Sequence, residues 1–271
     1  MIIEIRKKHL HFLYRDIIPK IGFFFRNKKE IPIIYYHDIG EGDNLNPISI
    51  LKSEFERQMQ YLSEKRFETY IFSEIPSGFH KSFRNSKEII ITFDDGFSSN
   101  YKIAFPILKK MKIKFNVFVS TRYIVRRDPC YLSKRMMEEM IESGIVEFGA
   151  HTHTHCDTRS LTADRYQEEF QYVNDFILSC GQKAVQDFCF PYGLYNRGSI
   201  ERISSLNLYK RLYTSDNRPI CYLGNSLIRG RVPITKSDDI KIFENKVNGK
   251  YSSLYLYSVM SQIYRKVTSK G

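Results

Sequence analysis

The chain has 271 residues, of which 42% are hydrophobic and 14% aromatic, a composition that supports a packed core and excludes disorder over most of its length. Its 42 Lys and Arg residues outnumber 30 Asp and Glu residues, and the net charge of +12 favours anionic partners such as phosphates, acidic lipid headgroups or nucleic acid without selecting among them. The 5 cysteines are odd in number and form no C-x-x-C pair, which argues against a disulfide framework or zinc knuckle and favours reduced thiols in a cytosol.

Residues 1–30 form a basic arm in which Leu10, Leu13 and Ile17 recur at helical spacing. Basic residues interrupt its apolar runs, so we see no secretory signal and expect a cytoplasmic protein. The arm has two interpretations. It packs as an edge helix with its lysines in water, or it lies on the cytoplasmic face of a membrane.

From residue 31 onward, apolar runs typical of buried strands alternate with helical patterns. The predicted strands are 31–36, 88–93, 115–120, 146–150 and 187–190. The predicted helices are 51–65, 101–111, 133–141 and 162–179. This alternation predicts a mostly parallel α/β sheet, whose ligands bind at the carboxyl ends of the strands. Asp94, His151 and Pro191 each follow a predicted strand, so we expect them at one mouth.

Residues 151–155 (HTHTH) contain an H-x-x-x-H pair. If this segment turns helically, His151 and His155 lie on one face, and two imidazoles with one carboxylate make a catalytic type of metal site, with Zn²⁺ as the leading candidate. Such a metal polarises a carbonyl and lowers the pKa of bound water toward about 7. The alternative interpretation is a pair of surface histidines.

Two further segments supply groups that this chemistry needs. In residues 91–96 (ITFDDG), a turn after the strand can aim one carboxylate at the metal and the other at the water as a base, although a plain Asp-Gly turn is the alternative. In residues 188–193 (FCFPYG), a strand ends in a Pro-x-Gly turn whose backbone N–H groups can stabilise an oxyanion.

In this order, the three segments resemble the motifs of the polysaccharide deacetylase family, also called the NodB-homology or carbohydrate esterase family 4 domain. The similarity extends over residues 31–235. It implies a distorted (β/α) barrel that removes N-acetyl, or sometimes O-acetyl, groups from sugars with a divalent metal, most often Zn²⁺, with Co²⁺ or Ni²⁺ as alternatives. By position, the base matches Asp94, the oxyanion contact matches the backbone of Tyr192, and the metal ligands match Asp95, His151 and His155. His153 matches no functional position.

The chain departs from many chitin and peptidoglycan deacetylases at two places. Their third motif carries an arginine that orients the base, where this chain has Cys189, and their late Leu-x-His supplies an acid, whereas no histidine follows His155 here. Cys156 and Cys189 adjoin the motifs, and we expect packing roles for both because neither has a Cys-His-Asn framework.

Residues 35–38 (YYHD) and 231–234 (RVPI) resemble the exopolysaccharide and poly-N-acetylglucosamine deacetylase branch. That branch places an early histidine in the site, which implies that His37 is the acid that protonates the leaving amine, with a structural histidine as the alternative. Arg231, or Arg229 in the same segment, is expected to replace the missing arginine unless both lie on the surface.

We therefore expect one catalytic domain, 31–235, between the basic arm 1–30 and a helical extension 236–271. The predicted function is metal-dependent hydrolysis of the N-acetyl amide bonds, and not peptide bonds, of an amino sugar in a surface polysaccharide or lipid-linked glycan. The alternatives are an O-acetyl esterase, a deformylase or an inactive glycan-binding domain. Nucleic acid is not an expected partner, because we see no zinc finger or RNA-binding motif. A peripheral position at the cytoplasmic membrane face fits the basic arm and a lipid-linked substrate.

Overall fold

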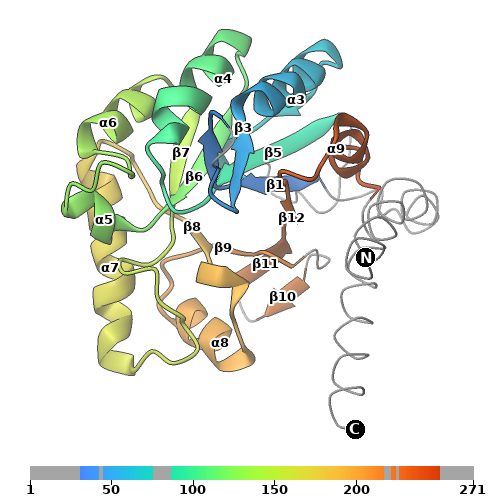
Figure 1. The fold of residues 1–271 in the computed structure, drawn as a ribbon. Coiled ribbons are helices and arrows are strands. Elements are labelled where there is room, and N and C mark those ends of the chain that lie inside the picture. Colours follow the sequence, from blue (N-terminus) through green and yellow to red (C-terminus); the bar gives the residue numbers. More distant parts are fainter. Residues whose placement is uncertain (1–30, 43–44, 76–86, 217–220, 224–225, 251–271) are drawn as a thin grey trace, which may run out of the picture.

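The computed structural model describes residues 31–42, 45–75, 87–216, 221–223 and 226–250 (Figure 1). The expected basic arm, and all of the expected C-terminal extension beyond residue 250, lie outside the described residues. Among the described residues, no helix has the length and apolar character needed to cross a bilayer.

Within the described part of the chain, a 10-stranded sheet curves into a nearly closed barrel. Its pairings are parallel except that between β10 and β11. Its strands are β1 (Ile33–Tyr36), β4 (Glu68–Thr69), β5 (Glu88–Phe93), β6 (Phe115–Val119), β7 (Val146–Ala150), β8 (Asp187–Cys189), β9 (Arg211–Thr214), β10 (Cys221–Leu223), β11 (Ser226–Gly230) and β12 (Val232–Pro233). A separate parallel pair joins β2 (Asp38–Gly40) and β3 (Ser49–Leu51).

Helices cover the outside of the barrel (Figure 1). They are α3 (Lys52–Glu64), α4 (Phe105–Met111), α5 (Thr121–Val125), α6 (Lys134–Glu142), α7 (Ala163–Ser179), α8 (Arg197–Ser205) and α9 (Ile240–Val247). In α3, the buried residues Phe55, Met59 and Leu62 follow helical spacing, so one face packs on the sheet and the other meets water. The predicted α/β barrel and its alternation of strands and helices are confirmed.

The register of the sheet brings three chain segments to one end of the barrel. Tyr36 pairs with Phe93, Phe93 pairs with Val117, and Val119 pairs with Ala150. The residues that follow β1, β5 and β7 therefore leave the sheet at the same end, as expected for parallel strands.

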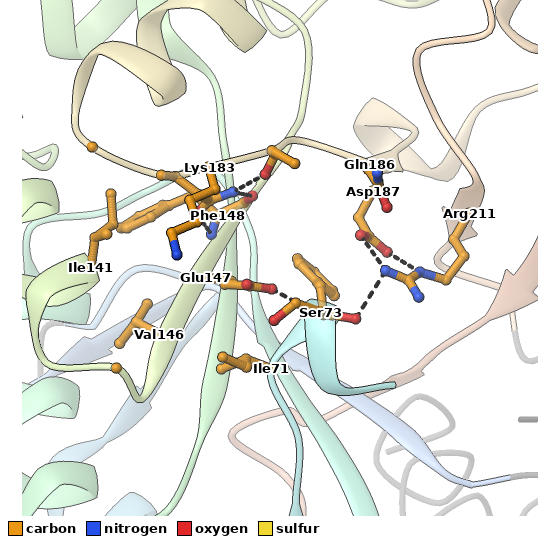
Figure 2. Close-up of a pocket in the computed structure, with 15 residues that line it drawn as sticks. Ile71, Ser73, Ile141, Val146, Glu147, Phe148, Lys183, Gln186, Asp187 and Arg211 are labelled. Carbon is orange, nitrogen blue, oxygen red and sulfur yellow. Dashed lines mark hydrogen bonds and ion pairs between the residues drawn. The ribbon is translucent and has the colours of Figure 1, made fainter. Parts of the chain in front are cut away.

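The other end of the barrel holds a pocket of about 320 Å³ at the starts of β7, β8 and β9 (Figure 2). Arg211 donates to both carboxylate oxygens of Asp187 at 2.5 and 2.7 Å and to the carbonyl of Phe72 at 2.9 Å. The backbone N–H of Ser73 donates to Glu147 at 2.6 Å. Because these polar groups satisfy one another, this end ties β8 and β9 to the segment before β5. The catalytic residues are expected at the opposite end, where the parallel strands end.

Candidate active site

The Asp94–Asp95 pair lies in a tight turn at the end of β5. The Asp94 N–H donates to the Tyr36 carbonyl at 2.9 Å, which continues the β1–β5 ladder, and the Gly96 N–H donates to the Asp94 carbonyl at 2.9 Å. Asp95 and Gly96 have φ values of +70° and +79°, and a Cβ on Gly96 would lie 2.9 Å from Val119. The left-handed turn directs the two carboxylates to different sides. The Asp-Gly turn and the two-carboxylate arrangement, which the sequence offered as alternatives, are therefore both present.

Asp95, His151 and His155 form a cluster that can hold a metal ion, because their ligand atoms all lie within 4.8 Å of one another. Asp95 Oδ1 is 3.5 Å from His151 Nε2 and 3.1 Å from His155 Nε2. His151 Nδ1 lies 2.8 Å from the Cys189 carbonyl, an outer contact that orients Nε2 toward the cluster.

Asp95 Oδ1 is the observation that best tests whether these residues fit a cation. It is buried, and among the described residues it has no hydrogen-bond partner of good geometry. Burial alone would raise the pKa of the Asp95 carboxyl, but its interactions with His151 and His155 outweigh burial and hold that pKa well below its usual range. An ionised carboxylate oxygen beside two imidazoles is a donor set that suits Zn²⁺.

Residues 151–155 do not form the helical turn that would place His151 and His155 on one face. The segment is irregular, and Thr152 and His155 have φ values of +62° and +57°. His151 and His155 still converge, with ring centroids 4.9 Å apart. His153 points away, as expected: its Nδ1 is 2.8 Å from the Thr121 hydroxyl.

Arg231 forms a buried bidentate ion pair with Asp94. Its Nη1 and Nη2 donate to the two carboxylate oxygens at 2.7 and 2.6 Å, and both side chains are at most 5% exposed. Burial works to raise the pKa of Asp94, but the charge and hydrogen bonds of Arg231 outweigh it and lower that pKa below 3.8. Asp94 is thus held ionised and fixed in orientation, as expected for the base.

Arg231 is itself held by groups from several strands. It donates to the Thr92 hydroxyl at 3.0 Å, to Cys189 Sγ at 2.8 Å and to the Thr214 carbonyl at 3.3 Å, and it lies 4.5 Å above the Tyr35 ring. Cys189 lies where related deacetylases were expected to carry an arginine, and its sulfur contacts the guanidinium of Arg231. Burial raises the pKa of the Cys189 thiol, so it stays protonated and packs.

Arg229, the alternative partner of Asp94, lies one layer deeper in the barrel. Its Nη2 donates to the carbonyl of Ile31, before the start of β1, at 3.4 Å. Arg231 therefore makes the contact to Asp94 that the sequence left open between the two arginines. The alternative interpretation as surface arginines is wrong for both, because each is 1% exposed. The contacts from Thr92, Thr214 and Cys189 were not foreseen, although Thr92 shares a strand face with Asp94 two residues later.

His37 follows β1 and so neighbours Asp94 across the β1–β5 pair. The buried Asn100 side chain donates to its carbonyl at 2.9 Å and fixes its backbone, and the ring is partly exposed at the mouth. The electrostatic interaction with His37 is among the smaller causes that lower the pKa of Asp94. The placement suits an acid, and that role stays a prediction.

Tyr192 occupies the predicted Pro-x-Gly turn, which is a single 3₁₀ turn over Pro191–Gly193. Its φ is +57°, its side chain is 66% exposed, and its ring lies 4.4 Å from that of His155. A Cβ on Gly193 would lie 1.7 Å from the Ser215 hydroxyl, so only glycine fits there. The turn thus places the Tyr192 ring, to which sequence assigned no role, beside His155 of the metal-binding cluster.

Comparisons with known proteins bear on this geometry. Residues 81–210 match the family model described as "Polysaccharide deacetylase". The Bacillus subtilis protein named "Putative polysaccharide deacetylase YxkH" is 28% identical over 173 residues, which cover 64% of this chain and 60% of that protein. The poly-beta-1,6-N-acetyl-D-glucosamine N-deacetylase of Staphylococcus aureus is 26% identical over 200 residues, or 69% of this chain and 63% of that protein. The chain thus spans less than two thirds of the length of both relatives.

Among solved structures, the Streptococcus pyogenes deacetylase PplD in complex with acetate superposes with a TM-score of 0.70 at 23% identity, covering 80% of this chain and 98% of that one. At this identity the similarity establishes the barrel fold.

Proposed function

Because the chain belongs to the polysaccharide deacetylase family, we propose that it is a divalent-metal-dependent hydrolase that removes N-acetyl groups from the amino sugars of a glycan. One observation carries the proposal: the metal-binding cluster of Asp95, His151 and His155 lies beside an ionised, buried Asp94 at one mouth of the barrel. An acyl carbonyl bound between the metal-binding cluster and Asp94 would lie within reach of both a metal ion and a base.

Asp95, His151 and His155 would hold the metal, with Zn²⁺ favoured by the two imidazoles and one carboxylate and Co²⁺ or Ni²⁺ as alternatives. When bound, the metal supplies Lewis-acid polarisation of the acyl carbonyl and acidifies water.

Asp94 takes the proton of the attacking water as the new C–O bond forms. Arg231 keeps the carboxylate ionised and holds both of its oxygens, so the base is charged and oriented before substrate binds. The Tyr192 N–H, presented by the left-handed turn, stabilises the oxyanion. His37 then protonates the amine nitrogen as the C–N bond breaks, and acetate and a free amino sugar leave.

The proposed substrate is a surface-polysaccharide intermediate or lipid-linked glycan carrying N-acetylated amino sugars, at the cytoplasmic face of the membrane. The named activity of the Staphylococcus aureus relative supports the sugar class, and the net charge of +12 supports contact with anionic lipids. Sedimentation of the full chain with vesicles containing acidic lipid tests this membrane contact. Binding that survives deletion of residues 1–30 would contradict the role given to the arm.

The central test measures acetate release from N-acetylated sugar oligomers by the purified protein with Zn²⁺ or Co²⁺. We expect Asp94→Asn to abolish release and keep the metal, and Asp95→Ala or His151→Ala to lose the metal itself, as measured by metal analysis after dialysis. His153→Ala is the matched control, because its ring points away from the cluster. Release of acetate by Asp94→Asn would refute the base assignment. Release of only O-acetyl or formyl groups by the parent protein would replace the N-acetyl proposal.

A further inference from the structure

Glu169 is a carboxylate buried on the packed face of α7, the long helix on the outside of the barrel (Figure 1). The apolar residues of this face, at helical spacing, are Tyr166, Phe170, Val173 and Ile177, all of them buried. Glu169 lies on the same face and is 0% exposed. A carboxylate in such a place lowers stability unless hydrogen bonds and an opposite charge compensate it. The groups that bind Glu169 therefore indicate what it does.

Thr154, the residue before His155 of the metal-binding cluster, donates twice to Glu169. Its backbone N–H donates to Glu169 Oε2 at 2.9 Å, and its hydroxyl donates to Oε1 at 2.7 Å. Arg165, one turn earlier on α7, supplies the opposite charge and donates to Oε1 at 2.8 Å. The Glu169 side chain thus joins α7 to the loop that carries the metal-binding histidines.

The same turn of α7 also holds the residue before Thr154. The N–H of His153 donates to the Glu169 carbonyl at 3.0 Å, and the ring of His153 lies 4.2 Å from that of Tyr172. Two consecutive residues between His151 and His155 are therefore bound to one turn of a helix that supplies no ligand.

The loop between the two histidines has a backbone that requires such contacts. Thr152 and His155 have φ values of +62° and +57°, and neither is a glycine. Non-glycine residues in the left-handed region carry a conformational cost, and they persist where the surrounding structure holds them in place. The geometry of the loop therefore depends on contacts made outside the metal-binding cluster.

The two histidines of the cluster are oriented in different ways. His151 follows β7 directly, and its Nδ1 lies 2.8 Å from the Cys189 carbonyl, so the sheet orients its ring. Within the described residues, His155 has no comparable outer hydrogen bond, and its side chain is 18% exposed. The position of His155 thus depends on the backbone of Thr154, which Glu169 binds.

We propose that Glu169 is a positioning residue for the metal-binding cluster. By binding Thr154, it holds His155 where its Nε2 meets Asp95 and His151, and it thereby raises the affinity of the cluster for Zn²⁺. This inference rests on the proposed function, which assigns a metal to the cluster.

The test measures the Zn²⁺ affinity of the purified full chain by competition with a chromophoric chelator. Glu169→Gln keeps the size of the side chain but replaces one acceptor oxygen by an amide group, so one contact to Thr154 is lost. We expect the Kd for Zn²⁺ to rise about tenfold, the lower end of the range for outer-shell substitutions, because Glu169 acts through the backbone of Thr154. The visible absorption bands of the Co²⁺-loaded protein should also change, because they report the geometry of the ligands.

Thr154 provides a milder pair of variants, which decides the question even if Glu169→Gln does not fold. Thr154→Val removes only the hydroxyl contact and should raise the Kd by a smaller factor, whereas Thr154→Ser keeps the hydroxyl and should retain the affinity. If Glu169 acts through Thr154, Glu169→Gln and Thr154→Val together should weaken Zn²⁺ binding by less than the product of their single effects.

Asn174→Ala is the matched control, because Asn174 is also a buried polar residue of α7 but binds the Tyr209 hydroxyl, at 2.9 Å. It should lower the urea midpoint of the metal-free protein and leave the Kd for Zn²⁺ unchanged. His153→Ala keeps the backbone N–H that donates to Glu169, and it should also leave the Kd unchanged.

Three results would overturn the inference: a Kd that neither Glu169→Gln nor Thr154→Val changes, an equal rise in Kd for Asn174→Ala, or a parent protein that binds no Zn²⁺. Failure of the proposed function gives a different result, in which the parent protein binds Zn²⁺ but releases acetate from no substrate. The Zn²⁺ affinities of the variants then still decide the role of Glu169.

Discussion

Replacing Arg231 by Met should leave the Asp94 carboxylate buried without its partner. Arg231 makes two charge-assisted hydrogen bonds to Asp94, at 2.7 and 2.6 Å, and Asp94 is only 4% exposed. Removing one member of a buried ion pair costs about 3–5 kcal/mol of folding free energy, because the remaining charge is uncompensated. We expect Arg231→Met to lose about this much stability at pH 7, measured by urea unfolding.

A double-mutant cycle separates this effect from simple loss of packing. Asp94→Asn alone leaves the guanidinium unpaired, so the single variants are each destabilised, whereas Arg231→Met combined with Asp94→Asn removes both charges. The double variant should therefore be more stable than the sum of the two single effects predicts, by at least about 1.5 kcal/mol. A cost below about 1 kcal/mol for Arg231→Met, or additive effects of the two substitutions, would refute the reasoning.

The direction of the Asp94 pKa shift determines how the folding stability should change with pH. Arg231 lowers the folded-state pKa of Asp94 below 3.8, so the stability from this pair is present above that pH and is lost as the pH falls through the folded-state pKa. Without Arg231, only the smaller effects of His151 and His37 oppose burial, so the pKa of Asp94 rises. The stability gap between the parent and Arg231→Met should narrow as the pH falls from the raised Asp94 pKa of the variant to the lowered Asp94 pKa of the parent, and the acid limb of kcat/KM should move to higher pH in the variant. An acid limb at the same pH in both proteins would show that another group is the base.

His37→Ala should lower kcat by on the order of 10²-fold or more if His37 protonates the leaving amine, whereas His153→Ala should not, and equal losses in both would remove the acid assignment. Gly193→Ala should lower both kcat and the melting temperature, since its Cβ would overlap a neighbouring serine hydroxyl at 1.7 Å. Gly144→Ala, which has a φ of +70° and open space, should cost only the backbone strain of about 1 kcal/mol; a larger loss for Gly144→Ala than for Gly193→Ala would contradict this. Arg211→Met, at the far end of the barrel, should lower the urea midpoint and leave kcat unchanged, and a change in kcat with little loss of stability would argue that this end takes part in turnover.

The parts of the fold that were predictable from sequence are those with strong periodicity. The strand at residues 88–93 and the long helix ending at Ser179 are apolar or amphipathic over enough residues to define their type and ends. The strands β9 to β12 have two to five residues each, and residues 217–220 and 224–225 between them are not described. Such short strands carry little pattern of their own, so the closing part of the barrel was not predicted.

Site residues that lie close together in the sequence were predictable. Those whose arrangement depends on backbone turns or on contacts between distant segments were not. Adjacent carboxylates and spaced histidines are visible in the chain itself. The left-handed residues Thr152 and His155 are not, because neither is a glycine or asparagine that would mark a positive φ, and so the convergence of the histidines was tied to a helical turn that does not form. The choice of Arg231 over Arg229 needed the structure, since both face the barrel interior and only their height in it decides which reaches Asp94.

The position of Arg231 links catalysis to the completion of the fold. In the order of the sheet, β11 lies near one edge and β12 forms the other edge, and Arg231 is the single residue that joins β11 to β12. The chain thus crosses from one edge of the sheet to the other at Arg231, the residue that pairs with Asp94. Asp94 lies 137 positions earlier in the sequence. A partly folded barrel without this last strand would hold His151 and His155 yet leave Asp94 without its ion-pair partner, so the proposed hydrolysis would begin only after the last strand has docked.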